Sequence, residues 1–188
     1  MGQLVYLNGR LVERDAARVD IYDHGFLYGD GVFEGIRAYQ RRIFRLDEHL
    51  VRLYRSARTL AIEVGIDLDG FRDAVIRTAQ ANGLESGYIR ITVSRGHGLG
   101  LDPSHIRCEP TVVISTEQLR LYAPEMYERG LDVITASTRV PPSCCIDPQM
   151  KSLGRYINNI NAKMEANRVG AGEALMLNMQ GNVAEATG

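Results

Sequence analysis

Residues 148–159 read Pro-Gln-Met-Lys-Ser-Leu-Gly-Arg-Tyr-Ile-Asn-Asn, and they contain Lys151, one of only two lysines in the chain. Lys151 follows a proline-rich loop and precedes an amphipathic helix, and side chains at such junctions tend to point into clefts. Arginine stays protonated, whereas a buried lysine can lose its proton and attack a carbonyl group. Lys151 is therefore the candidate amine nucleophile, with an ordinary surface lysine as the alternative. Lys163 lies inside the predicted helix, where a solvated lysine is expected.

Composition narrows the classes of protein that fit this chain. The 188 residues suit one domain or two small ones, and the contents of 45% hydrophobic and 24% charged residues are those of a globular protein. A net charge of −1 gives no nucleic-acid signature, and no apolar run approaches the length of a membrane helix. The N-terminus lacks the basic and apolar regions of a signal peptide.

Cysteine and histidine usage indicates the compartment. The three cysteines are an odd number, and the adjacent Cys144 and Cys145 would bridge poorly. The four histidines are scattered, and no Cys/His spacing resembles a zinc site, so we expect no metal. We expect a reducing, cytoplasmic location.

Hydrophobic periodicity predicts an α+β fold. The predicted domains are an N-terminal α/β domain at 1–117, a connector at 118–128, and the start of a second, C-terminal domain at 129–188. Asp47 and Asp69 are predicted to cap two helices. Within the last predicted helix, Asn161 falls among Ile157, Ile160 and Met164, where the pattern favours an apolar residue. Strands are predicted at 4–8, 11–12, 32–39, 43–46, 88–94, 111–116, 131–137, 173–178 and 182–185, and helices at 47–60, 69–83 and 153–169.

A lysine nucleophile works through a Schiff base, and its usual partner is pyridoxal phosphate. The pyridine nitrogen of that cofactor needs a carboxylate, and its phosphate needs an arginine or a helix N-terminus. Its phenolic oxygen benefits from a hydroxyl donor. The chain would have to supply all of these groups together with Lys151.

Three separated blocks of sequence carry a resemblance to a known family. They are Asp-His-Gly-Phe-Leu-Tyr-Gly-Asp-Gly-Val-Phe-Glu-Gly-Ile-Arg-Ala-Tyr at 23–39, the block at 49–57, and the segments between Lys151 and Glu185. In this order they resemble the class IV (fold type IV) pyridoxal-phosphate aminotransferases. The resemblance implies a small N-terminal α/β domain followed by an incomplete, barrel-like C-terminal domain, because family members continue past the Glu185 block.

Two motifs resemble one branch of that family, the branched-chain amino acid aminotransferases. They are Val-Phe-Glu-Gly-Ile-Arg at 32–37 and Tyr-Ile-Arg at 88–90. This branch implies amino-acid biosynthesis by transamination of branched-chain L-amino acids with 2-oxoglutarate, in a homodimer or higher homo-oligomer. A D-amino acid aminotransferase and an aminodeoxychorismate lyase share the scaffold and stay open as alternatives, as does a catalytically inactive fragment. Neither nucleic acid nor membrane is an expected partner.

The resemblance also implies the residues that hold the cofactor. Lys151 would form the Schiff base and carry the proton, and Glu185 would face the pyridine nitrogen. Tyr156 would donate to the phenolic oxygen, and Arg52 would bind the phosphate. Taken singly, each of these residues could instead be an ordinary structural or surface residue. Arg52, for example, shares its predicted helix with other arginines, where a solvated arginine is common.

Six further positions are implied to bind substrate. Strand residues two apart share a face, so Tyr88 and Arg90 could act together. Tyr28, Phe33 and Gly35 would line an aliphatic pocket, Tyr88 and Arg90 would hold substrate carboxylates, and Leu101 would reach across a dimer interface.

Overall fold

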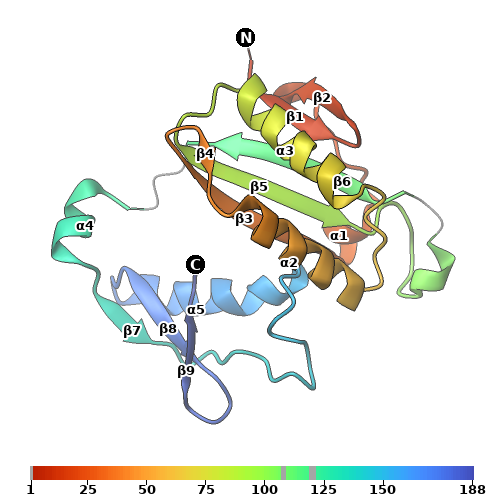
Figure 1. Ribbon diagram of the computed structural model, residues 1–188. Helices are drawn as coiled ribbons and strands as arrows, with labels where there is room; N and C mark the ends of the chain where they lie inside the picture. Colours follow the sequence, from red (N-terminus) through yellow and green to blue (C-terminus); the bar gives the residue numbers. More distant parts are fainter. Residues whose placement is uncertain (1, 107–108, 119–121) are drawn as a thin grey trace. The chain divides into compact units, whose positions relative to one another are not determined.

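The computed structural model describes residues 2–106, 109–118 and 122–188, which form two compact units (Figure 1). The first unit comprises Met1–Leu119 together with Lys151–Leu153, and the second comprises Arg120–Met150 together with Gly154–Gly188. A short segment from late in the chain thus packs with the N-terminal residues. The domain boundaries given above stay a prediction, and 119–121 of the predicted connector lie outside the described residues.

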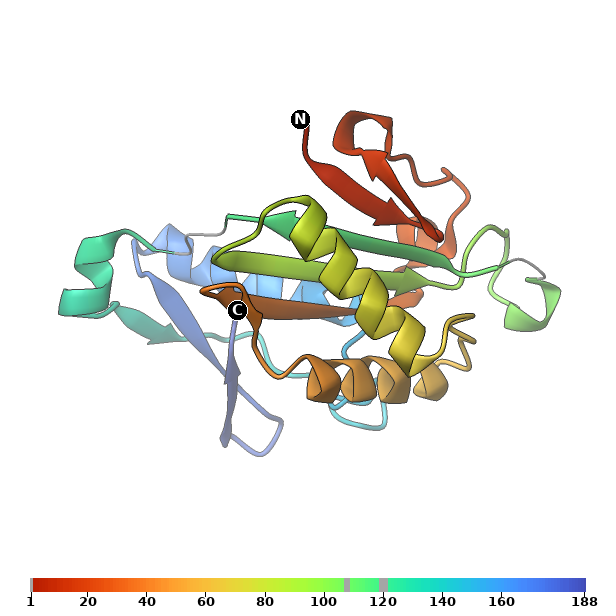
Figure 2. The same cartoon turned by 45° about the horizontal axis from the view of Figure 1, so that its top comes forward.

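An antiparallel sheet organises the first unit. Among the described residues its strand order is β2-β1-β6-β5-β3-β4, which places β5 and β3 in the interior. Helices α2 and α3 cover one face of the sheet (Figures 1 and 2). The elements are β1 Leu4–Leu7, β2 Arg10–Glu13, η1 Arg14–Ala16, α1 His24–Tyr28, β3 Gly31–Tyr39, β4 Arg42–Ile43, α2 Leu46–Thr59, α3 Leu68–Ala81, β5 Gly87–Ser94, η2 Pro103–His105 and β6 Thr111–Glu117.

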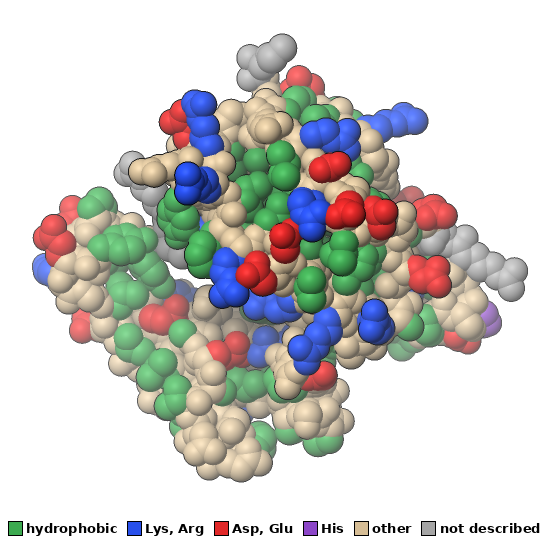
Figure 3. Space-filling view, in the orientation of Figure 1, with side chains coloured by type: hydrophobic (Ala, Val, Ile, Leu, Met, Phe, Trp, Pro, Cys, Tyr) green, Lys and Arg blue, Asp and Glu red, His purple; other side chains and the backbone are tan. Residues whose placement is uncertain are grey.

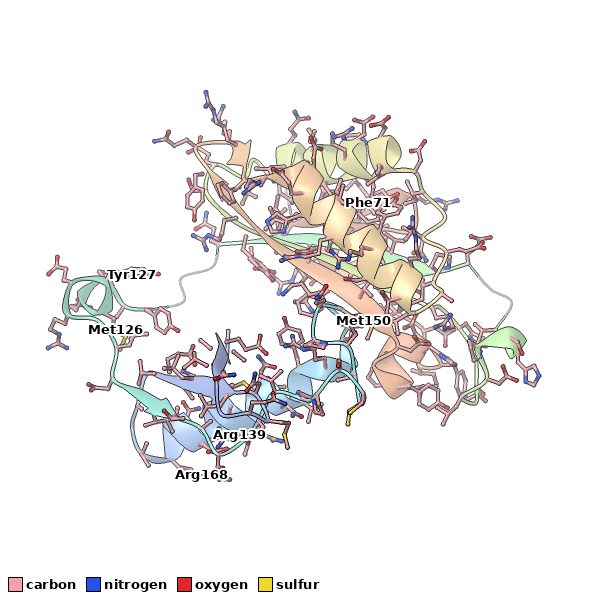
Figure 4. The ribbon with its side chains drawn as sticks, turned by 60° about the horizontal axis from the view of Figure 1, so that its bottom comes forward. Phe71, Met126, Tyr127, Arg139, Met150 and Arg168 are labelled. Carbon is pink, nitrogen blue, oxygen red and sulfur yellow. The ribbon has the colours of Figure 1, made fainter. Side chains whose placement is uncertain are left out.

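Alternation along the two interior strands separates a core face from an opposite face. Val32 and Ile36 of β3 and Ile89 of β5 are fully buried, and they join Phe71 of α3 in one hydrophobic cluster (Figure 4). Burying a side chain of this size contributes about 1.5–3 kcal/mol. This cluster fixes which face of β3 and β5 meets the helices, and therefore which side chains point the other way.

Charged side chains of both signs intermingle over the first unit in Figure 3. Arg41 and Glu85 form an exposed ion pair at 2.5 Å, and Arg72 lies 2.6 Å from Asp47. Pairs of this kind contribute little to stability, with a typical value of about 0–1 kcal/mol. The helices are therefore held mainly by the core.

The helix caps differ from those predicted. Helix α2 begins after Arg45, whose left-handed backbone (φ 48°) turns the chain, and Asp47 lies inside the first turn. Helix α3 is capped by Asp67, which accepts a 2.8 Å hydrogen bond from the Gly70 N–H, and Asp69 is already helical. Both predicted caps are therefore wrong. An acidic residue in the first turn is also favoured by the helix dipole, so the pattern does not separate the two positions.

The second unit contains a three-stranded sheet and one long helix within its described residues. Strand β8 pairs in parallel with β7 and antiparallel with β9, and β8 and β9 confirm the strands predicted at 173–178 and 182–185. Gly181 has φ +85°, a conformation that favours glycine. The elements are α4 Pro124–Arg129, β7 Val133–Thr135, η3 Gly154–Tyr156, α5 Ile157–Arg168, β8 Glu173–Leu177 and β9 Val183–Ala186.

The buried face of α5 is not the one that its apolar pattern favours. Ile157 is 61% exposed, Ile160 is 57% exposed, and Asn161 is exposed as well. Small and polar residues face the second unit's core instead, so Asn161 needs no buried partners. The buried positions are Asn159, Ala162 and Ala166.

A carboxylate fastens α5 to the loop after β7. Glu165 accepts hydrogen bonds from the backbone N–H and the hydroxyl of both Ser137 and Thr138, at 2.6–3.0 Å. The Thr138 hydroxyl contributes most, and together these donors lower the pKa of Glu165 to about 2. Hydrogen bonds to the charged form have this effect on a carboxyl group.

Among the described residues, no helix has the length and apolar character needed to cross a membrane.

We expect Glu165→Gln to destabilise the second unit at neutral pH and to flatten its acid response. A carboxyl group whose pKa falls on folding stabilises the fold above its ordinary value of 4.5, and this contribution is lost as the pH falls towards about 2. Urea unfolding of both proteins between neutral pH and about pH 2 measures the difference. The exposed Glu128→Gln is the control, and equal pH profiles for wild type and Glu165→Gln would contradict the assignment.

Candidate active site

The backbone around Lys151 is fixed to the edge of β3. The Phe33 N–H donates to the Lys151 carbonyl at 3.0 Å, and the Leu153 N–H donates to the Gly31 carbonyl at 2.8 Å. Ser56 of α2 adds a third point, since its Oγ accepts from the Lys151 N–H at 3.2 Å. Three hydrogen bonds thus fix the backbone around Lys151 as firmly as that of a strand residue. A catalytic side chain requires such a fixed backbone.

The Lys151 side chain lies over the ring of Phe33, a predicted substrate residue, and the side chain of Arg90 lies over the same ring. Lys151 Nζ lies 4.7 Å from the centre of the Phe33 ring, and Cζ of Arg90 lies 3.6 Å from the same centre. A cation within about 6 Å of an aromatic ring is attracted by it. Lys151, Phe33 and Arg90 therefore form one group on the first unit.

Sheet register explains why these residues gather. Gly35 of β3 lies opposite Arg90 of β5, and both point away from the helix-covered core. Tyr88 lies two residues along on the same face, and a Cβ built on Gly35 would overlap the Tyr88 hydroxyl and approach its Cε2 to 2.7 Å. A side chain at position 35 would displace the Tyr88 ring, so glycine is needed there for close approach.

Arg52, the predicted phosphate ligand, is held by a residue that the sequence analysis missed. Its guanidinium donates two hydrogen bonds, of 2.5 and 2.6 Å, to the fully buried Glu34. The His49 ring nitrogen Nδ1 lies 2.8 Å from the same carboxylate. Glu34 stands on the core face between Val32 and Ile36, and a charged residue at such a position is a signal that the sequence did offer. The side chain of Arg52 stays 49% exposed, which leaves it accessible to an anion.

A second buried network supports Tyr28. The Arg95 guanidinium binds both oxygens of Asp30, at 2.6 and 3.0 Å, and His24 Nδ1 lies 3.0 Å from Asp30. Burial alone would raise the pKa of Asp30, but the hydrogen bonds from Arg95 and His24 outweigh it and hold the pKa below its usual range. The His24 ring packs edge-on against Tyr28 with centroids 4.9 Å apart.

Tyr28 and the loop that carries Leu101 lie together. The Gly100 N–H donates to the Tyr28 hydroxyl at 3.3 Å. Tyr28 is 42% exposed and Leu101 is 80% exposed, so both present apolar surface. These residues form a group of their own on the first unit.

The other two predicted cofactor residues belong to the second unit. Tyr156 ends η3, and Glu185 lies on β9. Arg155, which the sequence analysis did not single out, joins them: its Nη2 lies 2.5 Å from Glu185, and its Cζ lies 5.5 Å from the Tyr156 ring centre. Arg155 is 7% exposed, and its Nε is buried without a hydrogen-bond partner among the described residues.

A hollow in the first unit contains none of the predicted site residues. It has a volume of about 640 Å³ and lies between the end of α3 and β4. Ile43, Leu46 and Leu84 line it, and its cation, Arg41, is paired with Glu85. Among the described residues no lysine lines this hollow, so it lacks a candidate nucleophile such as Lys151.

Known proteins are similar to this chain in both sequence and fold. Residues 31–188 match the amino-transferase class IV family model. A putative branched-chain-amino-acid aminotransferase of Methanocaldococcus jannaschii is 44% identical over 186 residues, which cover 98% of this chain and 62% of the relative. The chain thus spans less than two thirds of this relative's length.

Solved structures agree. The branched-chain amino acid aminotransferase of Escherichia coli has a TM-score of 0.94 and 29% identity, covering 100% of this chain and 64% of that one. The branched-chain aminotransferase of Thermoproteus uzoniensis with norvaline has a TM-score of 0.90 and 33% identity, covering 100% and 64%. With a family model matched over most of its residues, this chain belongs to the class IV aminotransferases.

Proposed function

We propose that this chain performs pyridoxal-phosphate-dependent transamination of branched-chain L-amino acids, with 2-oxoglutarate as the amino acceptor. The observation that carries the proposal is the fixed position of Lys151 beside Phe33 and Arg90. The relatives named above support the branched-chain assignment over the D-amino acid and lyase alternatives. The proposal extends to the whole enzyme, of which this chain covers about 62% by comparison with its relative.

The residues present fit the cofactor. Bound pyridoxal phosphate supplies an aldehyde that bonds an amine and a ring that accepts the negative charge developing at the substrate carbon. Two buried donors, Ser152 Oγ and Arg155 Nε, lack hydrogen-bond partners within the described residues, as expected of groups that serve a ligand. Arg52 offers a positioned cation for the phosphate, and Glu34 fixes its guanidinium.

Each of the remaining residues has one task in the proposed reaction. Lys151 Nζ takes the proton from the α-carbon of the substrate, holds it, and then delivers it to complete the transfer of the amino group. The Glu185 carboxylate would keep a proton on the pyridine nitrogen of the bound cofactor, and the Tyr156 hydroxyl would donate to its phenolic oxygen. These two roles rest on the family resemblance and on the placement of both residues in the second unit.

The same pocket must accept an aliphatic side chain and the side chain of glutamate. Phe33 offers an apolar wall, while Arg90 stacks on that ring and offers a cation for the second carboxylate. Gly35 leaves room for Tyr88 beside them. Phe33 would therefore contact the aliphatic side chain of a branched-chain substrate, and Arg90 would bind the side-chain carboxylate of glutamate.

We also propose a homodimer that is located in the cytoplasm. Phe26 is 75% exposed, Leu99 is 66% exposed and Leu101 is 80% exposed, and all three lie on α1 or on the loop bonded to it. Exposed apolar side chains that gather in this way mark an interaction surface. The odd number of cysteines in the sequence fits a reducing compartment.

Lys151→Ala should abolish covalent attachment of the cofactor and lower transamination by at least about 10²–10⁴-fold, the contribution of a positioned proton carrier. Borohydride reduction of the cofactor-loaded protein, followed by peptide mapping, locates the modified amine. Lys163→Gln is the matched control because Lys163 is the other lysine of the chain. A label on Lys163, or none on a folded protein that has bound the cofactor, would refute the proposal.

Gly35→Ala should lower kcat/KM for leucine on the order of 10²-fold, because displacing a substrate-binding ring by about 1 Å has effects of this size. Steady-state kinetics and the melting temperature are measured on the same preparation. The double variant Gly35→Ala/Tyr88→Ala removes the overlap and should not be worse than Tyr88→Ala alone. Unchanged kinetics in Gly35→Ala would show that Tyr88 does not bind substrate.

A further inference from the structure

The segment that precedes Lys151 carries two adjacent cysteines that the proposed function does not use. Its two end residues, Val140 and Met150, are buried, and Val140 is hydrogen-bonded to Leu177 of β8. The buried Val140 donates its N–H to the Leu177 carbonyl at 3.0 Å, and the buried Met150 donates to the Asp147 carbonyl at 3.1 Å. Figure 4 labels Arg139 and Met150, which flank the segment. The segment is therefore anchored to β8 at its Val140 end.

A tight turn presents the two cysteines. The N–H groups of Cys145 and Ile146 both donate to the Pro142 carbonyl, at 2.9 and 3.2 Å. The proline ring restricts its own backbone and stiffens the start of this turn. Cys144 and Cys145 are free and exposed, and the two thiols hydrogen-bond to one another. The turn thus offers two thiols side by side to solvent.

A direct disulfide between these thiols is disfavoured by geometry. Neighbouring Cα atoms across a trans peptide are about 3.8 Å apart, whereas disulfides prefer about 4.4–6.8 Å. No cis peptide occurs among the described residues. The hydrogen bond to Cys144 also raises the pKa of the Cys145 thiol, so Cys145 keeps its proton at neutral pH. The pair is therefore built to remain a dithiol.

A single atom bonded to both sulfurs relaxes this constraint. It widens the ring by one atom, and its bonds to sulfur, at about 2.3 Å for zinc as an example, are longer than the S–S bond of about 2.05 Å. Thiolates are soft ligands and select soft, thiophilic centres. No group of three or more His, Cys, Asp or Glu that could hold a metal occurs among the described residues, so a tetrahedral protein site is not formed here.

We propose that Cys144 and Cys145 form a dithiol site for trivalent arsenicals. Trivalent arsenic is pyramidal, bonds two sulfurs at an angle that adjacent thiols can satisfy, and keeps its third bond for an organic group or hydroxyl. An arsenoxide R–As=O condenses with the two S–H groups to give R–As(S)₂ and one water. Two As–S bonds form, both thiol protons leave in the water, and no oxidation state changes. This site requires neither the cofactor nor aminotransferase activity.

The probe is phenylarsine oxide, added to the full chain in the absence of cofactor. We expect one arsenical per chain by intact mass, removed by ethanedithiol but not by an equal concentration of a monothiol. Binding through two sulfurs is favoured over binding through one by about 10²–10⁴-fold. Trypsin cleavage after Arg139 and Lys151 gives a peptide that holds both cysteines, so peptide mapping locates the arsenical without any variant.

Cys144→Ser and Cys145→Ser should each weaken binding by about 10²-fold or more, because each leaves a single thiol. Cys108→Ser tests the remaining cysteine of the sequence and should bind as the wild type does. Arsenic mapped to a peptide other than 140–151, no monothiol-resistant adduct, or equal binding by the single-serine variants and the wild type would each overturn the proposal. Failure of Lys151 to take up cofactor would leave this result unaffected, so the two proposals are tested separately.

Discussion

The structure depends on a short backbone pairing that joins Lys151–Leu153 to the edge of β3. This pairing brings a residue from late in the sequence against the N-terminal sheet, and it places the Lys151 amine 4.7 Å from the centre of the Phe33 ring. Strand β4 pairs with β3 only at Ala38 and Tyr39, so the other end of β3 offers backbone N–H and C=O groups on this side, and the Lys151 segment pairs with them at Val32. The position of Lys151, the candidate nucleophile, is thereby coupled to the stability of the core beneath β3.

The sheet divides its tasks between two faces. On the core face Val32 and Ile36 pack under α2 and α3, while the opposite face carries Phe33, Gly35 and Arg90. Glu34 is an exception, since it is a charged residue on the core face. A buried charge is costly unless it is paired. Arg52 and His49 provide the pairing, and in doing so they fix the candidate phosphate ligand. The same buried carboxylate of Glu34 therefore affects both the stability of the core and the position of Arg52.

The sequence predicted much of this arrangement and missed parts of it for identifiable reasons. Strand alternation predicted the strands of the sheet, and the lysine at a loop-to-helix junction gave Lys151 as the candidate nucleophile, which stays a prediction. The caps at Asp47 and Asp69 were wrong because acidic residues are favoured both at a cap and in the first turn. The buried face of α5 was wrong because a helix can pack small residues such as Ala162 and leave Ile160 exposed. Arg155 could not be found, since nothing local reveals its pairing with Glu185 across the second unit.

Amide hydrogen exchange at Phe33 and Leu153 tests the central pairing most directly. Both amides donate to backbone carbonyls within it, so we expect them to exchange as slowly as the amides of the interior strands β3 and β5. Protection should persist in Lys151→Ala, which keeps the backbone donors and acceptors. Exchange of Leu153 at the rate of an open loop, in a protein whose β5 amides are protected, would contradict the account.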